Sequence, residues 1–168
     1  MSRVIKNTIR YIAAGAVMAS VFTQSTLACM NENDEMADKI RFMQTQMMVA
    51  AMQCRKANDG VMPHLYNNFI KGHRGQLIQS GQRLEVYLAR TQKIDVASYL
   101  NAIANRLSVD SGDEPQFCGR MRMVMEMSAN LNNPLALLDI MPVKYKRRVG
   151  RCQSQPDSHV IAMNDIKF

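Results

Sequence analysis

Apolar residues after residue 30 recur mainly at spacings of three and four, which is the period of an α-helix with one buried face. The first series covers 36–54 and predicts a long helix with Asn31 or Asn33 as its N-cap. Asp34 and Glu35 favour the same start, because carboxylates in the first turn complement the helix dipole. The residues expected on the buried face are Met36, Ile40, Met43, Met47, Ala50 and Cys54.

Three more helical series follow, separated by turn sequences. One long helix is predicted over 66–88, although three glycines within it reduce its stability. The next helix is predicted over 96–107, with Asp95 as its cap. The fourth is predicted over 117–128, with Pro115 at its first helical position.

Four consecutive helices with short connections predict an all-α fold, packed as an antiparallel up-down four-helix bundle. The bundle domain would cover 29–141, including a short helical turn at 135–140. The remainder, 142–168, has no sustained period and predicts a basic, largely irregular C-terminal tail. A chain of this size supports one modest core, so we expect a single domain.

Four cysteines lie after residue 28, and their even number predicts two disulfides in an exported protein. None has the Cys-x-x-Cys spacing of a redox pair or a zinc site. In an up-down bundle the end of the first helix meets the start of the fourth, which pairs Cys54 with Cys118. Cys29 and Cys152 then form the second bridge.

Residues 1–28 have the order of a cleavable signal peptide, with a basic start, an apolar run and small residues before Cys29. The run is too short for a membrane span, which needs roughly 20 apolar residues. Thr26 and Ala28 suit cleavage before Cys29, so we expect export to the periplasm. A lipoprotein anchored through Cys29 is the alternative, although Leu27 lies one position too close to that cysteine.

The formal charge of +7 is mild once the signal is removed. Residues 1–28 hold three basic and no acidic residues, which leaves +4. This balance and the sparse aromatic residues argue against nucleic-acid binding. One basic cluster stands out, and it predicts either a solvated tail or a weak contact with an anionic surface. It consists of Lys144, Lys146, Arg147, Arg148 and Arg151.

Five stretches stand out along the chain: CMN, IRFMQTQMMVAAMQC, YNNFIKGHRGQL, YLNAIANRLS and FC. They resemble a family of short exported bacterial proteins of unknown function, with four cysteines and one motif per helix. The resemblance covers most of 29–120 and implies a shared helical fold with shared bridges. Some members carry the label S-adenosylhomocysteine hydrolase, but this chain has no dinucleotide-binding glycine motif and no alternating strands and helices.

The 15 methionines raise the alternative of a Cu(I) carrier, since thioethers are soft ligands. Helical geometry favours core packing instead, because Met121 and Met125 share one face while Met123 and Met127 share another. We therefore predict no metal site, no cofactor and no tight Cu(I) binding. Methionine-lined space between helices remains an alternative site for a small ligand.

The histidines are the obvious candidates for catalysis. His64 and His73 lie nine residues apart, so they cannot chelate one metal together, and His159 lies in the tail. His73 beside Arg74, or Glu126 among methionines, would be the acid or base of an unrecognised enzyme. The sequence has no hydrolase, protease or phosphate-loop motif, so we assign no catalytic residue.

Three classes of function follow from the sequence. A structural or interaction module of the periplasm, with a protein partner, fits the disulfides and the helical pattern best. A small-ligand or Cu(I) carrier and a hydrolase-type enzyme with an unfamiliar site are the alternatives.

Overall fold

The computed structural model describes residues 29–57, 60–148, 150 and 152, and this part of the chain is all-helical, as predicted. None of its helices is long and apolar enough to span a membrane. The expected signal sequence, Arg151 and His159 lie outside the described residues. The elements are α1 (Glu32–Gln53), α2 (Met62–Gly72), α3 (Arg74–Thr91), α4 (Val96–Asp110), α5 (Phe117–Ser128) and the 3-10 helix η2 (Pro134–Ile140).

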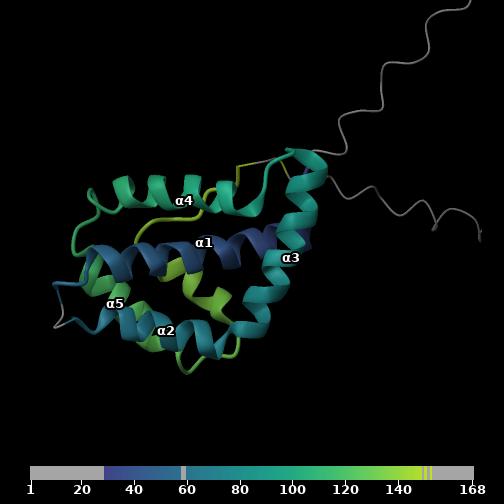
Figure 1. Ribbon diagram of the computed structural model, residues 1–168. Coiled ribbons are helices and arrows are strands. Elements are labelled where there is room, and N and C mark those ends of the chain that lie inside the picture. Colours follow the sequence, from purple (N-terminus) through teal and green to yellow (C-terminus); the bar gives the residue numbers. More distant parts are fainter. Residues whose placement is uncertain (1–28, 58–59, 149, 151, 153–168) are drawn as a thin grey trace, which may run out of the picture.

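Helix α1 lies at the centre of the molecule and contacts every other helix. Figure 1 shows α4 along one side of α1 and α2 with α5 along the other, while α3 crosses near the start of α1. The N-cap is Asn31, as predicted, and it forms a capping box with Asp34. The Asp95 cap of α4 is also confirmed, because its side chain accepts from the Ser98 backbone N–H.

The single long helix predicted over 66–88 is wrong, because the chain turns at His73 and forms α2 and α3. Glycines on both sides of this residue weaken the helix there. The His73 side chain is buried, and its Nε2 lies 3.1 Å from the Ser128 carbonyl oxygen at the end of α5. The described part thus has five α-helices, and the predicted up-down order of four is not confirmed.

Two smaller expectations are also corrected. Pro115 lies in the turn before α5, because Gln116 adopts a left-handed backbone with φ of 57° and the helix begins at Phe117. Met36 is 47% exposed, although it continues the apolar series of the first helix. The first turns of α1 instead bury Asp34, Glu35 and Asp38 together with Ala37, so this end of the helix buries charged as well as apolar side chains.

The two sides of α1 bury different cores. One core, here called the methionine core, packs α1 against α2, α5 and η2. The other, here called the tyrosine core, packs α1 against α3 and α4. The methionine core contains Met43, Met47, Met62, Phe69, Met121, Met125 and Met141, and the tyrosine core contains Met30, Phe42, Leu84, Tyr87, Tyr99, Ile103 and Leu107.

The cysteines form the two predicted pairs. Cys54 directly follows α1 and Cys118 lies in the first turn of α5, with 5.5 Å between their Cα atoms. Cys29 joins Cys152 with 4.9 Å between Cα atoms, which ties the two ends of the described chain together. Both separations lie within the range that a disulfide requires.

Residues 142–148, here called the strap, run along α1 on the side that faces α4 (Figure 1). The strap has no helical hydrogen bonds, as expected for this irregular segment, but it is packed rather than loose. The buried Gln46 side chain donates to the Val143 carbonyl oxygen at 3.3 Å. Beyond the strap, Met30 exchanges backbone hydrogen bonds with Gly150 and Cys152. The described tail residues therefore belong to the folded unit.

Candidate functional site

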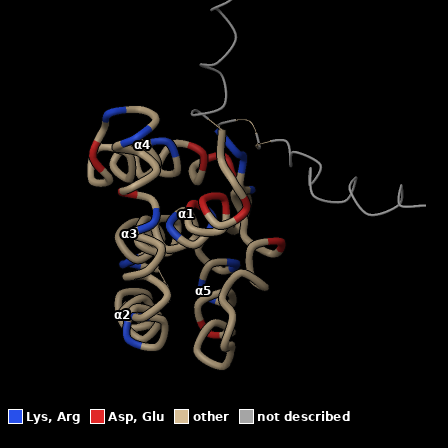
Figure 2. The backbone as a smooth tube through the Cα atoms, turned by 90° about the vertical axis from the view of Figure 1, so that its right-hand side faces the viewer, with Lys and Arg blue, Asp and Glu red and all other residues tan. Residues whose placement is uncertain are grey.

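Three carboxylates lie buried on the N-terminal half of α1. Asp34, Glu35 and Asp38 are each no more than 5% exposed. Burial of unpaired charge is costly, so each needs a partner from another element. Arg83 of α3 supplies one to Asp34, with its Nε 2.6 Å from the carboxylate. In Figure 2 the acidic positions near the start of α1 lie among basic positions from other segments.

Asp38 joins three parts of the fold. The hydroxyls of Tyr99 in α4 and Tyr145 in the strap each donate to one of its carboxylate oxygens, both at 2.7 Å. Burial, and then the neighbouring Asp38 charge, raise the pKa of Tyr99 and of Tyr145 well above the ordinary value. Both phenols therefore stay protonated and keep donating at neutral pH.

The basic cluster of the strap is used partly for structure. Arg147 lies 3.5 Å from Glu35, which also pairs with Lys39, and the Arg148 guanidinium lies 4.9 Å from the centre of the Tyr99 ring. Such contacts stabilise the strap on α1 and α4. Lys144 donates to the Asp139 carbonyl oxygen, which leaves Lys146 as the strap cation with no hydrogen bond, ion pair or ring contact to another described residue. The described part of the predicted basic cluster is therefore packed on the fold, and a contact with an anionic surface stays a prediction.

A groove of about 340 Å³ lies between α4 and the strap and is here called the α4–strap groove. Apolar side chains form its floor, and charged side chains from α4, the following loop and the strap form its rim. The volume is at the lower end of the range for ligand pockets. The floor contains Phe42, Ile103, Leu107 and Val143, and the rim contains Arg106, Asp110, Asp113, Glu114, Lys144, Lys146 and Arg148.

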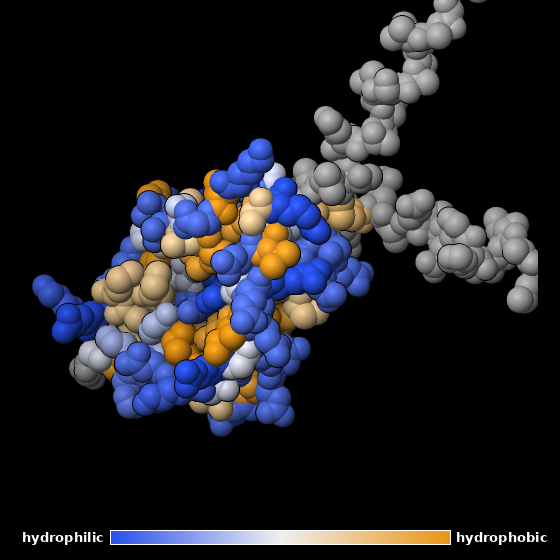
Figure 3. Space-filling model, turned by 45° about the vertical axis from the view of Figure 1, so that its right-hand side comes forward, coloured by the Kyte–Doolittle hydropathy of each residue, from blue (hydrophilic) through white to orange (hydrophobic). Residues whose placement is uncertain are grey.

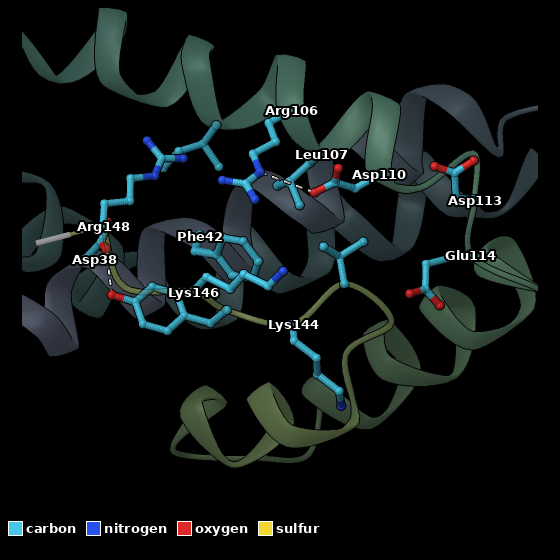
Figure 4. A pocket seen from close by; sticks show the side chains of 13 residues that line it. Asp38, Phe42, Arg106, Leu107, Asp110, Asp113, Glu114, Lys144, Lys146 and Arg148 are labelled. Atoms are coloured by element: carbon cyan, nitrogen blue, oxygen red, sulfur yellow. Dashed lines mark hydrogen bonds and ion pairs between the residues drawn. The ribbon is translucent and has the colours of Figure 1, made fainter.

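The charges on this rim are separated by sign. Figure 4 shows Arg148, Arg106 and Lys146 toward one end of the groove and Asp113 with Glu114 toward the other. Arg106 pairs with Asp110 at 3.4 Å and Glu114 pairs with Arg120 at 3.2 Å, so these charges already have partners. The groove therefore presents an apolar floor with a positive and a negative end, an arrangement suited to a dipolar ligand.

The histidines and Glu126 do not meet in one site. His64 is exposed in the first turn of α2, and Glu126 is exposed on α5, where it pairs with Arg122 at 2.8 Å. His73 contributes to a shallow hollow of about 650 Å³, together with asparagine and glutamine side chains. No arginine lines this hollow within the described residues.

The methionines are divided as the helix period predicted. Met121 and Met125 are buried in the methionine core, whereas Met123 and Met127 are 49% and 44% exposed on the other face of α5. Met48 and Met52 line a separate hollow of about 400 Å³ between α1 and α2. No group of three histidine, cysteine or acidic side chains among the described residues is arranged to hold a metal.

Sequence patterns did not indicate Asp38, Tyr99 or the acidic rim residues as parts of a site. Their spacing along the chain forms no motif. They come together only because α1, α4 and the strap lie side by side in the fold. Asp38 follows Met36 by two residues and so lies opposite the expected buried face of the first predicted helix, and no pattern marked it. No family model, curated protein or solved structure matches this chain.

Proposed function

We propose that this protein is an exported interaction module that binds a partner protein through the α4–strap groove. The observation that carries the proposal is a pair of exposed side chains of opposite sign on the groove rim, Lys146 and Asp113. Neither side chain makes a hydrogen bond or ion pair with another described residue. They are therefore available to a ligand without loss of an internal contact.

The rest of the surface supports this choice of groove. Exposed apolar side chains are distributed over α1, α3, α4 and α5, and Figure 3 shows them as separate groups among hydrophilic residues. Contiguous apolar patches of several hundred Å² are the usual mark of a large permanent interface. A small charged groove fits a weaker, reversible contact instead.

Export and family membership are parts of the same proposal. Two disulfides are typical of proteins in oxidising compartments, which supports the periplasm as the location. The residues that resemble the exported helical family include three of the four cysteines, which agrees with membership of it. The intact mass of the exported product should correspond to a chain beginning at Cys29 without lipid. A lipid adduct, or an uncleaved chain, would contradict this part.

The interaction itself can be tested by photo-crosslinking in cells that export the protein. A benzophenone amino acid at position 106 lies on the groove rim, and the same group at Glu85, exposed on α3, is the matched control. We expect a discrete protein adduct from position 106 only, and its loss in a Lys146→Glu background. Equal adducts from both positions, or none from position 106, would refute an interaction through the groove.

A further inference from the structure

The strap has a backbone edge without a partner. No backbone–backbone hydrogen bond joins residues 142–148 to other described residues, and the Val143 carbonyl oxygen accepts from the Gln46 side chain. Yet the segment is held in place, by Tyr145 on Asp38 and by Arg147 on Glu35. Unpaired N–H and C=O groups on a fixed segment are a template for a second strand.

Contacts along the strap alternate in the way expected for an extended chain. Val143, Tyr145 and Arg147 face α1, where they contact the cores or the buried carboxylates. Lys146, between two of them, lies on the groove rim instead. A period of two is the geometry of a β-strand, whose main-chain groups then point sideways. One of these sides faces α4 across the groove.

The groove has the length of a short extended peptide. From Ile103 to Asp110, α4 advances about 10 Å at 1.5 Å per residue, which equals about three residues of extended chain. The loop with Asp113 and Glu114 continues the rim beyond the end of α4. A peptide of about five residues would reach from the positive end to the negative end.

From these observations we infer that the α4–strap groove takes an extended peptide segment that pairs with the strap backbone and carries an acidic and a basic side chain about four residues apart. The acidic side chain would meet Lys146, and the basic one would meet Asp113, because Arg106 is paired with Asp110 and Glu114 with Arg120. This inference rests on the proposed function and adds the class of ligand. Because pairing with the strap backbone would fix the direction of the peptide, the opposed ends would bind one charge order and repel the other.

Two blocked peptides of equal composition test the charge order, acetyl-Asp-Val-Thr-Val-Lys-amide and acetyl-Lys-Val-Thr-Val-Asp-amide. Titration calorimetry at low salt should give weak binding for one order and at least about tenfold weaker binding for the other, because each 1.4 kcal/mol is a factor of ten. The double variant Lys146→Glu/Asp113→Lys should reverse the preference. The matched control Lys71→Glu/Glu85→Lys, at exposed sites outside the groove, should not change it.

N-methylation of single peptide bonds tests the backbone pairing. In the preferred peptide, methylation at alternate positions should weaken binding several-fold, whereas methylation at the positions between should have little effect. Equal affinity for both charge orders, no binding of either, or indifference to N-methylation would each overturn the inference. If the groove crosslink is nevertheless found in cells, the interaction module stands and only its peptide ligand is refuted.

Discussion

The two cores on either side of α1 use different means to hold the same helix. The methionine core is assembled from apolar side chains, with the buried Cys54 bridged to Cys118 at one edge. The tyrosine core lies against three buried carboxylates and depends on hydroxyl and guanidinium partners from other elements. Apolar packing tolerates changes of shape, whereas a buried charge needs each partner in place. The α4–strap groove lies over the tyrosine core, whose buried charges have the stricter requirements.

Loss of the bridge beside the methionine core should have the largest effect on stability. We expect Cys54→Ala/Cys118→Ala to lower the free energy of unfolding by about 4 kcal/mol, because this bridge joins the end of α1 to the first turn of α5 inside the core, whereas the other bridge joins the two ends of the described chain. Urea unfolding followed by circular dichroism measures this loss.

The bridge at the chain ends should act differently. Cys29→Ala/Cys152→Ala should release the strap first, seen as faster hydrogen exchange at 143–148. If both double variants lost the same stability in urea and showed the same hydrogen exchange in the strap, the difference between the two bridges would be contradicted.

Removal of the Asp38 carboxylate should be the most damaging single change beside the tyrosine core. Asp38→Ala leaves the hydroxyls of Tyr99 and Tyr145 without their acceptor, and we expect a loss of about 3 kcal/mol. Urea midpoints give the value. Asp139→Ala, at an exposed position of η2, is the control and should change stability by less than about 0.5 kcal/mol. Equal effects of the two substitutions would show that Asp38 has no joining role.

Alkaline pH should destabilise the tyrosine core selectively. The pKa values of Tyr99 and Tyr145 are raised in the folded state, so their contribution is complete below the ordinary tyrosine pKa of about 10. Above it the unfolded chain releases protons that the folded chain retains, and stability falls by up to about 1.4 kcal/mol per pH unit for each tyrosine.

Urea midpoints from pH 8 to pH 11 test this dependence. Tyr145→Phe should make the fall with pH shallower, because one of the phenols with a raised pKa is gone. Phe69→Leu, in the methionine core, should lower stability by a similar amount at every pH. An unchanged slope in Tyr145→Phe would show that this phenol is not the source of the pH dependence.

The smallest effect is expected from a change of shape in the methionine core. Met121→Leu keeps nearly the same apolar volume at a fully buried position, so we expect a loss of less than about 1.5 kcal/mol. Tyr99→Phe removes one oxygen atom from the other core and should cost at least as much, since the Asp38 carboxylate loses a donor. Thermal unfolding of both variants compares them. A larger loss in Met121→Leu would reverse the contrast between the cores.

Local signals in the sequence determined much of the fold. The helix period, the Asn31 and Asp95 caps and the turn at 111–115 place α1, α4 and α5 nearly correctly, because these features act within a few residues. The cysteine pairing was also predicted, since it requires only that the end of α1 meet the start of α5. The same period failed at His73, where a contact with Ser128 across the fold decides the turn.

The groove was decided by tertiary structure alone. Asp38 and Tyr145 are 107 positions apart, and no spacing along the chain relates them. The sequence determined that residues 142–148 are basic and not helical. Whether they stay in solvent or pack depends on the buried carboxylates of α1, which need cations and hydroxyls from distant elements. That need holds the strap against α1 and leaves Lys146 opposite α4.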